Sequence, residues 1–317
     1  MTRRLAIRNI AVAGAVSLYF CPLLGSPRDD RPGEDYVFHS EVRLVLLDVS
    51  VKDRAGSFVK GLSKEAFDVF ENNVSQNITV FANNDLPVTV GILVDESGSM
   101  APKRADVLAA AETFIQESNS RDEIFVLNFN DTVKRGLPNQ TLFSDNIKQL
   151  RSALYRGIPG GKTALNDAVV DGLKQLELGT RGRKALIVIS DGGDNASQYK
   201  RQEMLDKIEG SVATVYTIGL FDANDSDRNP GVLNRLAKIS GGQAYFPESS
   251  SRMASVCRDI AEDIRARYTI GYLPQERKGT GSQRHIRISA RIPGHAKLTA
   301  RARTSYRYDE LTYPSNK

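Results

Sequence analysis

Histidine is scarce in this chain of 317 residues, and this limits the enzymatic chemistry it can support. The three histidines are His39, His285 and His295, all outside the central part of the sequence. No His-Glu-x-x-His pattern occurs, which excludes the usual helical zinc-protease site. No Gly-x-Ser-x-Gly turn occurs either, and no histidine lies near a candidate serine in sequence, so a serine hydrolase is disfavoured.

Cysteine is scarcer still, with Cys21 and Cys257 only. Cys21 falls inside a segment typical of export signals, which has arginines near its start, an apolar run over 10–24 and small residues before Pro27. We therefore predict a signal peptide over residues 1–26 and an exported protein, periplasmic or extracellular. Cleavage would leave Cys257 without a disulfide partner, and its place in an apolar helical pattern predicts a buried structural thiol.

A membrane anchor is the alternative to a cleaved signal. The apolar run is short for a membrane span of roughly 20 residues, which favours cleavage. The residues at the cleavage position fit poorly, however, because Leu23 stands where a small side chain is expected. A membrane-anchored form therefore stays open.

The chain also lacks an excess of either charge. It has 43 basic and 38 acidic residues, and without the three arginines of the proposed signal the basic total falls to 40. This balance does not indicate a nucleic-acid partner. With 40% hydrophobic residues, the chain is long enough for one large globular domain with additional elements.

Residues 87–267 alternate short apolar runs with amphipathic helical segments, which predicts an α/β fold with a doubly wound, mostly parallel, Rossmann-like sheet. The expected strands cover 88–94, 124–129, 185–189 and 213–218. The expected helices cover 102–117, 164–176, 202–208, 231–239 and 251–267.

Both flanks of this central part have strand-like alternation. Residues 27–86 form an N-terminal β segment, with runs at 42–51, 67–70 and 78–81, and residues 268–317 form a C-terminal one. Each flank has too few strands for a stable sheet alone. We therefore expect the two to pair into a small accessory β domain. The arginines of the C-terminal flank are expected to lie on a polar strand face: Arg284, Arg287, Arg291, Arg301, Arg303 and Arg307.

A set of oxygen-bearing side chains follows the central strands. Asp95 comes directly after the first strand, and Asp-x-Ser-x-Ser spacing places Ser97 and Ser99 on the same side of one loop. Gly98 allows the tight turn this requires. Carboxylate and hydroxyl oxygens suit a hard cation such as Mg²⁺, Mn²⁺ or Ca²⁺ better than zinc.

The segments Asp95-Glu96-Ser97-Gly98-Ser99, Gly161-Lys162-Thr163 and Ser190-Asp191-Gly192 together resemble the metal-ion-dependent adhesion site (MIDAS) of von Willebrand factor A (vWA) domains. The resemblance implies direct metal contacts from the hydroxyls of Ser97, Ser99 and Thr163. It implies that Asp95 and Asp191 act mainly through water or hydrogen bonds. Glu96 and Asp194 are expected to be neighbours rather than ligands.

The flanks narrow this resemblance to one family of vWA-related proteins. The run 61–71 before the central part and 268–272 after it are similar to the vWA-related family first described from acidobacterial genomes. The likeness covers about 42–308. Asn72-Asn73 stands where that family is expected to have a glycine-containing turn, and asparagine tolerates positive φ, so the hairpin is expected to form.

Two other patterns do not predict a ligand site. Gly160-Gly161-Lys162-Thr163 lacks the first glycine of a phosphate-binding loop, because Arg156 occupies that position, so no nucleotide is expected. The acidic loop 222–227 has Pro230 and Leu236 where a calcium loop needs glycine and glutamate, so a solvated loop is expected.

The resemblance implies cell adhesion rather than catalysis. The expected function is protein binding through a divalent cation, most plausibly Mg²⁺, completed by an Asp or Glu of a protein partner. The alternatives are a structural or assembly module of the cell envelope with a dispensable metal site, and a metal-assisted hydrolase with Glu96 as its base. We expect no enzyme activity, and contact with a membrane only through an uncleaved anchor.

Overall fold

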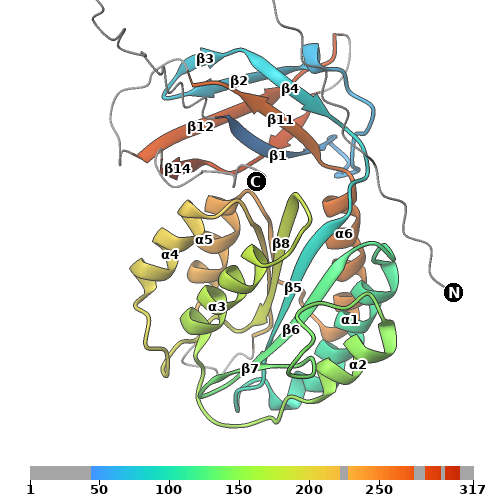
Figure 1. Ribbon diagram of the computed structural model, residues 1–317, viewed down its shortest axis with the longest axis vertical. Helices are drawn as coiled ribbons and strands as arrows, with labels where there is room; N and C mark the ends of the chain where they lie inside the picture. Colours follow the sequence, from blue (N-terminus) through green and yellow to red (C-terminus); the bar gives the residue numbers. More distant parts are fainter. Residues whose placement is uncertain (1–43, 222–227, 275–282, 294–296, 308–317) are drawn as a thin grey trace, which may run out of the picture. The chain divides into compact units, whose positions relative to one another are not determined.

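The computed structural model describes residues 44–221, 228–274, 283–293 and 297–307 (Figure 1). The predicted signal peptide over 1–26, His39, His295 and the acidic loop 222–227 lie outside these residues. Among the helices of the described part, none is long and apolar enough to span a membrane.

The central sheet has six strands in the order β10-β9-β8-β5-β6-β7. All neighbours are parallel except β7, which pairs antiparallel with β6. Every residue of β5 is buried, as expected for a strand covered on both faces. The strands are β5 (Val88–Asp95), β6 (Glu123–Phe129), β7 (Val133–Arg135), β8 (Arg183–Ser190), β9 (Thr214–Gly219) and β10 (Ala244–Tyr245).

Helices cover both faces of this sheet, with α1, α2 and α6 on one side and α3, α4 and α5 on the other (Figure 1). The predicted doubly wound α/β fold is confirmed. The helices are α1 (Arg104–Glu117), α2 (Ile147–Tyr155), α3 (Leu165–Glu177), α4 (Arg201–Gly210), α5 (Pro230–Ser240) and α6 (Met253–Arg265). Short 3-10 helices cover η1 (Lys64–Ala66), η2 (Ala101–Lys103) and η3 (Ser250–Arg252). Cys257 is buried on α6, as predicted.

Two four-stranded antiparallel sheets form the accessory β domain, and each contains strands from both flanks. The first has the order β13-β1-β11-β4, and the second has the order β14-β12-β2-β3. Their inner faces share one apolar core, to which Leu47, Phe67 and Ile270 belong. The predicted pairing of the flanks is therefore confirmed. The strands are β1 (Val45–Lys52), β2 (Phe67–Glu71), β3 (Val74–Gln76), β4 (Ile78–Ala82), β11 (Tyr268–Tyr272), β12 (Gln283–Ala290), β13 (Thr299–Arg301) and β14 (Ser305–Arg307).

Asn72 and Asn73 form the turn between β2 and β3, with φ of 48° and 67°. The expectation that asparagine would permit this hairpin is confirmed. The run over 78–81 is not the second strand of this hairpin, however. The short strand β3 pairs with β2, whereas β4 lies in the other sheet beside β11. The alternation of 78–81 identifies a strand but not its neighbour, which is set by tertiary packing.

The expected polar face for the C-terminal arginines is wrong at two positions. Arg284 is buried and forms an ion pair with buried Glu71 at 3.0 Å. Arg303 is also buried and donates hydrogen bonds to the backbone carbonyls of Glu209 and Ser211. Each of these arginines can be buried because fixed acceptors receive hydrogen bonds from its guanidinium group.

Candidate metal site

The candidate site lies where the winding of the sheet reverses. The chain passes from β5 to β6 on one side, whereas β8 lies on the other side of β5. Asp95 ends β5, and Asp191 follows directly after β8. Ligands of open α/β sheets bind at such a switch point, beyond the carboxyl ends of the strands. The two carboxylates therefore reach the same edge of the sheet.

Asp95 is 2% exposed and is held at both of its oxygens. Oδ1 accepts a hydrogen bond from the backbone N–H of Ser97 at 2.8 Å. Oδ2 accepts one from the hydroxyl of Ser190 at 2.6 Å. Burial raises the pKa of Asp95 to about 6, and the nearby charge of Asp191 also raises it, against these hydrogen bonds. A cation beside this pair of acids would relieve the cost of their burial.

Hydroxyl groups connect the first loop to Asp191. The Ser97 and Ser99 hydroxyls lie 3.2 Å apart. The Ser99 hydroxyl donates to Oδ2 of Asp191 at 2.5 Å, and the backbone N–H of Gly193 donates to Oδ1 at 2.9 Å. Ser97 and Asp191 are buried, whereas Ser99 is exposed. The site is therefore a buried oxygen cluster that reaches the surface at Ser99.

Thr163 comes to the same edge through the backbone of its loop. The N–H of Gly98 donates to the carbonyl of Gly161 at 3.2 Å, and the N–H of Gly160 donates to the carbonyl of Glu96 at 2.7 Å. Gly160 and Gly161 have φ of 127° and 83°, which favour glycine. The backbone N–H of Thr163 is fixed by the side chain of Asn195 at 2.8 Å. The structure thus brings all five predicted positions together, four by hydrogen bonds among themselves and Thr163 by its loop.

Glu96 and Asp194 make their contacts elsewhere. Oε2 of Glu96 is 2.7 Å from Nε of Arg104, and the Glu96 side chain is almost fully buried. Asp194 accepts hydrogen bonds from the backbone and side chain of Asn166 at the start of α3. These contacts fit the expectation that neither residue belongs to the ligand set.

Sequence reasoning missed the residues that position the ligands. Ser190 holds Asp95 from the end of β8, and Asn195 holds Thr163. Arg104 ties the first loop to the Thr163 loop, because it contacts Glu96 and donates to the carbonyl of Gly157 at 2.9 Å. Ser190 carries a usable sequence signal, since it directly precedes Asp191. The contacts of Asn195 and Arg104 depend on the fold.

The residues present fit a hard divalent cation. The set offers carboxylate and hydroxyl oxygens, which Mg²⁺, Mn²⁺ and Ca²⁺ prefer. No group of three or more His, Cys, Asp or Glu side chains placed to hold a metal was found among the described residues. Metal binding here would therefore depend on the serine and threonine hydroxyls.

The comparison with protein families identifies the fold. A model of the von Willebrand factor type A domain matches residues 89–259, more than half of the chain. The chain belongs to this family. The match includes all five candidate positions, and it agrees with the six-stranded sheet and its flanking helices. The two β flanks lie outside the residues that match this model.

Several solved structures are similar to this chain at low sequence identity. A von Willebrand factor type A protein from Catenulispora acidiphila is 15% identical, with a TM-score of 0.48 over 78% of this chain and 74% of its own. The vWF domain of the pili tip protein Mfa5 from Porphyromonas gingivalis is 12% identical, with a TM-score of 0.48 over 57% of this chain and 95% of its own. The search of curated proteins gave no match.

A third structure is the proximal thread matrix protein 1 of the mussel byssus. It is 12% identical, with a TM-score of 0.50, and covers 62% of this chain. The alignment spans half of the mussel chain. That protein is described with a zinc-occupied MIDAS motif.

Proposed function

We propose that this vWA domain binds a protein partner through a divalent cation at Asp95, Ser97, Ser99, Thr163 and Asp191. The observation that carries the proposal is the hydrogen-bonded set of Ser97, Ser99 and Asp191 beside buried Asp95. These oxygens come from separate loops and converge at one sheet edge, so the fold positions them before any ligand arrives. Such preorganisation lowers the cost of binding.

The roles that we propose within the set are those that the resemblance to the MIDAS implies. Ser97, Ser99 and Thr163 would hold the cation through their hydroxyls, with Asp95 and Asp191 fixing those hydroxyls or bound water. When bound with few direct carboxylates, the cation supplies net positive charge to an acidic side chain of the partner. Ser99 is exposed, so this end of the cluster is accessible to such a group.

Mg²⁺ is the cation that we propose, with Mn²⁺ and Ca²⁺ as alternatives. All five positions offer oxygen, and hard cations prefer oxygen ligands. The zinc reported in the mussel protein supports a divalent site in this family fold, but this chain has no nitrogen or sulfur ligand among the five positions. Zinc prefers those ligands.

The setting that we propose is outside the cytoplasm. The sequence of residues 1–26 supports export to the periplasm or the cell exterior, with an uncleaved anchor as the alternative. We also propose that the chain belongs with the acidobacterial-type vWA-related proteins, on the basis of its two β flanks. The domain limits proposed from sequence are 27–86, 87–267 and 268–317.

A metal-assisted hydrolase is less well supported. Glu96 was the candidate base, but its carboxylate is paired with Arg104 at 2.7 Å and buried. We therefore propose binding rather than catalysis.

The test is affinity capture from a cell-envelope extract of the source organism, with wild type and Asp95→Ala as bait. We expect specific partners to be retained with Mg²⁺ and lost with a chelator or with Asp95→Ala. Asp145→Ala is the matched control, because Asp145 is exposed and outside the site. Partners retained equally by all baits, with or without chelator, would instead support a structural module with a dispensable metal site.

A further inference from the structure

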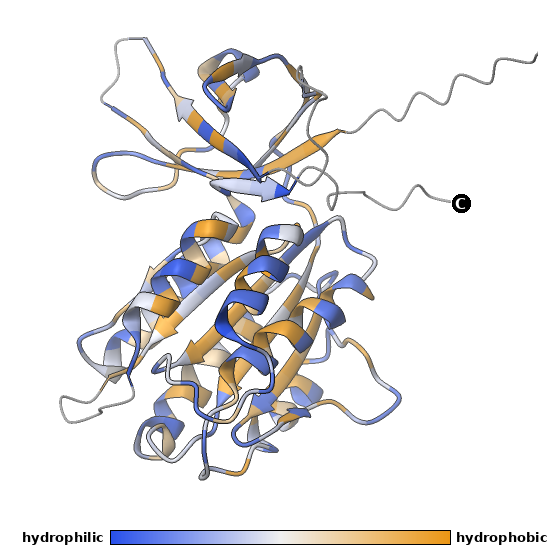
Figure 2. Ribbon diagram, turned by 90° about the vertical axis from the view of Figure 1, so that its left-hand side faces the viewer, coloured by the Kyte–Doolittle hydropathy of each residue, from blue (hydrophilic) through white to orange (hydrophobic). Residues whose placement is uncertain are grey.

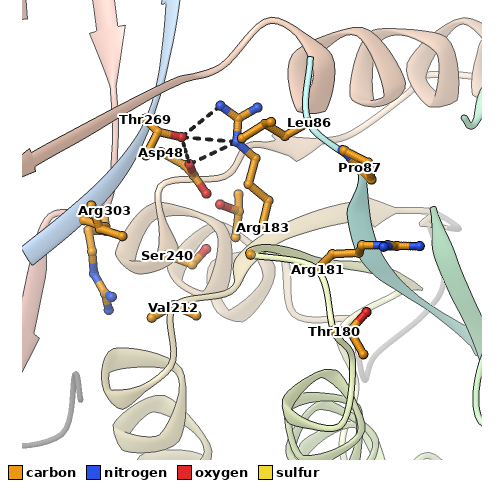
Figure 3. Close-up of a pocket in the computed structure, with 13 residues that line it drawn as sticks. Asp48, Leu86, Pro87, Thr180, Arg181, Arg183, Val212, Ser240, Thr269 and Arg303 are labelled. Carbon is orange, nitrogen blue, oxygen red and sulfur yellow. Dashed lines mark hydrogen bonds and ion pairs between the residues drawn. The ribbon is translucent and has the colours of Figure 1, made fainter. Parts of the chain in front are cut away.

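A cavity of about 320 Å³ lies at the edge of the central sheet that is opposite the candidate metal site (Figure 3). It is bordered by residues at the amino ends of three parallel strands, including Pro87 before β5, Gly182 before β8 and Val212 before β9. Asp48 of β1 and Thr269 of β11 close it from the accessory β domain. Because the candidate metal site lies at the carboxyl ends of β5 and β8, the two sites are separate.

Arg183 dominates the chemistry of this cavity. The residue is 5% exposed. Its Nη2 donates to the carbonyl of Arg267 at 2.8 Å and to the hydroxyl of Thr269 at 2.9 Å. Its Nε lies 3.4 Å from Oδ1 of Asp48. These contacts fix the guanidinium group from one side.

The remaining nitrogen of this group, Nη1, is buried and has no hydrogen-bond partner. Buried charged donors are rarely left unsatisfied, because they lose their hydration without compensation. A cavity of this size can hold a ligand that supplies the missing acceptor. An oxyanion is the strongest acceptor for a guanidinium donor.

The surrounding wall is partly apolar. Figure 3 shows the guanidinium group of Arg183 between Asp48 and Thr269 on one side and Leu86 on the other. Leu46, Pro87 and Val212 also line the cavity. The side chains of Arg181 and Arg303 extend away from the Arg183 guanidinium (Figure 3). The cavity therefore places the guanidinium group of Arg183 beside apolar surface.

We propose that this cavity binds a small organic carboxylate, with the carboxylate at Nη1 of Arg183 and its apolar body against Leu86, Pro87 and Val212. The ligand carries a single negative group, because Arg181 is already paired with Glu123 at 3.7 Å, whereas Nη1 of Arg183 has no hydrogen-bond partner. Binding would join the vWA domain to the accessory β domain, since both supply walls. This inference does not depend on the metal site.

Isothermal titration calorimetry on the full chain tests the proposal, with acetate, isovalerate and phenylacetate as probes and phenylacetamide as the uncharged match. We expect saturable binding of the carboxylates, tighter as the apolar body grows, and at least tenfold weaker binding of the amide. If no carboxylate binds, the cavity holds water only and the proposal is wrong. Equal binding of phenylacetate and phenylacetamide would also overturn it.

Two variants locate the binding. Arg183→Gln is expected to weaken phenylacetate binding by about tenfold to a hundredfold. Since this change also removes contacts to Asp48 and Thr269, Leu86→Trp provides a second test at the rim. It should block binding by filling the cavity while leaving Arg183 in place.

Leu142→Trp is the matched control, because Leu142 and Leu86 are 40% and 39% exposed and Leu142 does not line the cavity. Unchanged affinity in this control together with loss in Leu86→Trp supports the site. Unchanged affinity in Leu86→Trp places binding elsewhere and contradicts the proposal.

Discussion

The hydroxyl of Ser99 donates a hydrogen bond to Asp191 at 2.5 Å, across 92 positions of the chain. The two residues lie in loops that follow β5 and β8, which are neighbours in the sheet. The contact joins the exposed end of the oxygen cluster to its buried acid. Among the proposed ligands, Ser99 is therefore the one whose hydroxyl we expect to be removable with least damage to the fold.

Ser99→Ala should weaken Mn²⁺ binding by about tenfold or more while leaving the free energy of unfolding nearly unchanged. The change removes one hydroxyl oxygen from an exposed position. Titration calorimetry and urea unfolding measure the two quantities. Ser152→Ala is the control, since Ser152 is an exposed helical serine away from the site. Equal Mn²⁺ affinity in both variants would remove Ser99 from the ligand set.

Asp263 of α6 joins the vWA domain to the accessory β domain. Its Oδ2 lies 2.8 Å from nitrogens of both Arg267 and Arg301, and it is fully buried. Burial alone would raise the pKa of Asp263, but these two guanidinium groups lower it well below its usual range. Tyr216 also donates to it at 2.6 Å. The ionised carboxylate is thus the stable form in the folded chain.

Asp263→Asn should lower the free energy of unfolding by about 3–5 kcal/mol at neutral pH, because it leaves buried Arg267 and partly buried Arg301 without their anion. Urea unfolding measures this loss. The control Asp259→Asn changes an exposed carboxylate of the same helix and should shift the value by about 0.5 kcal/mol or less. A similar small shift for Asp263→Asn would mean that the ion cluster contributes little.

The same cluster predicts acid sensitivity. A depressed pKa stabilises the fold above the unfolded value of about 3.9, and this contribution is lost as the pH falls below it toward the folded pKa. Wild type should therefore lose stability steeply below about pH 4. Asp263→Asn should show a shallower decline in urea unfolding over that range. Parallel pH profiles would contradict the assignment of the shift to Asp263.

The turn at Asn72-Asn73 gives a local test of backbone conformation. Asn73 has a φ of 67°, which glycine adopts freely and alanine does not. We expect Asn73→Ala to cost about 1 kcal/mol of unfolding free energy. Asn73→Gly should cost nothing or stabilise the fold, as in other two-residue hairpins. Thermal unfolding measures these effects, with Asn139→Ala as the control, because Asn139 is an exposed turn residue without positive φ. Equal effects of Asn73→Ala, Asn73→Gly and Asn139→Ala would contradict this prediction.

Burial controls the reactivity of Cys257. The apolar surroundings raise the pKa of its thiol to about 12, so almost no thiolate forms near neutral pH. In a Cys21→Ser background, the thiol should react with a disulfide reagent at pH 8 only after urea unfolding. Rapid labelling of the folded chain would show that α6 opens readily or that the thiol is accessible.

Much of the vWA fold could be predicted from sequence because its strands are apolar and its helices amphipathic. β11 covers 268–272, at the start of the predicted C-terminal β segment, and β5 extends one residue past its prediction to Asp95. The short strands β3, β7, β10 and β14 were not predicted. Each has two or three residues, and pairing with a neighbour defines it rather than any periodic pattern.

The candidate ligands could be predicted because three short segments match the MIDAS pattern in order. The residues that hold these side chains in place could not be predicted. The bond from Ser190 to Asp95 exists because β5 and β8 are adjacent, and strand order cannot be read from one strand alone. Likewise, the alternation around Arg284 defines two strand faces but does not indicate which one is buried. Arg284 is on the buried face, where it pairs with Glu71, 213 positions away in the chain.

The central claim is that a divalent cation binds at Asp95 and its neighbours. Titration calorimetry of Mg²⁺ and Mn²⁺ into wild type, Asp95→Ala and the surface control Asp145→Ala measures this directly, with circular dichroism to verify folding. We predict one saturable site in wild type and in Asp145→Ala, and none in folded Asp95→Ala. Equal binding in all three proteins, or binding in none, would contradict the account.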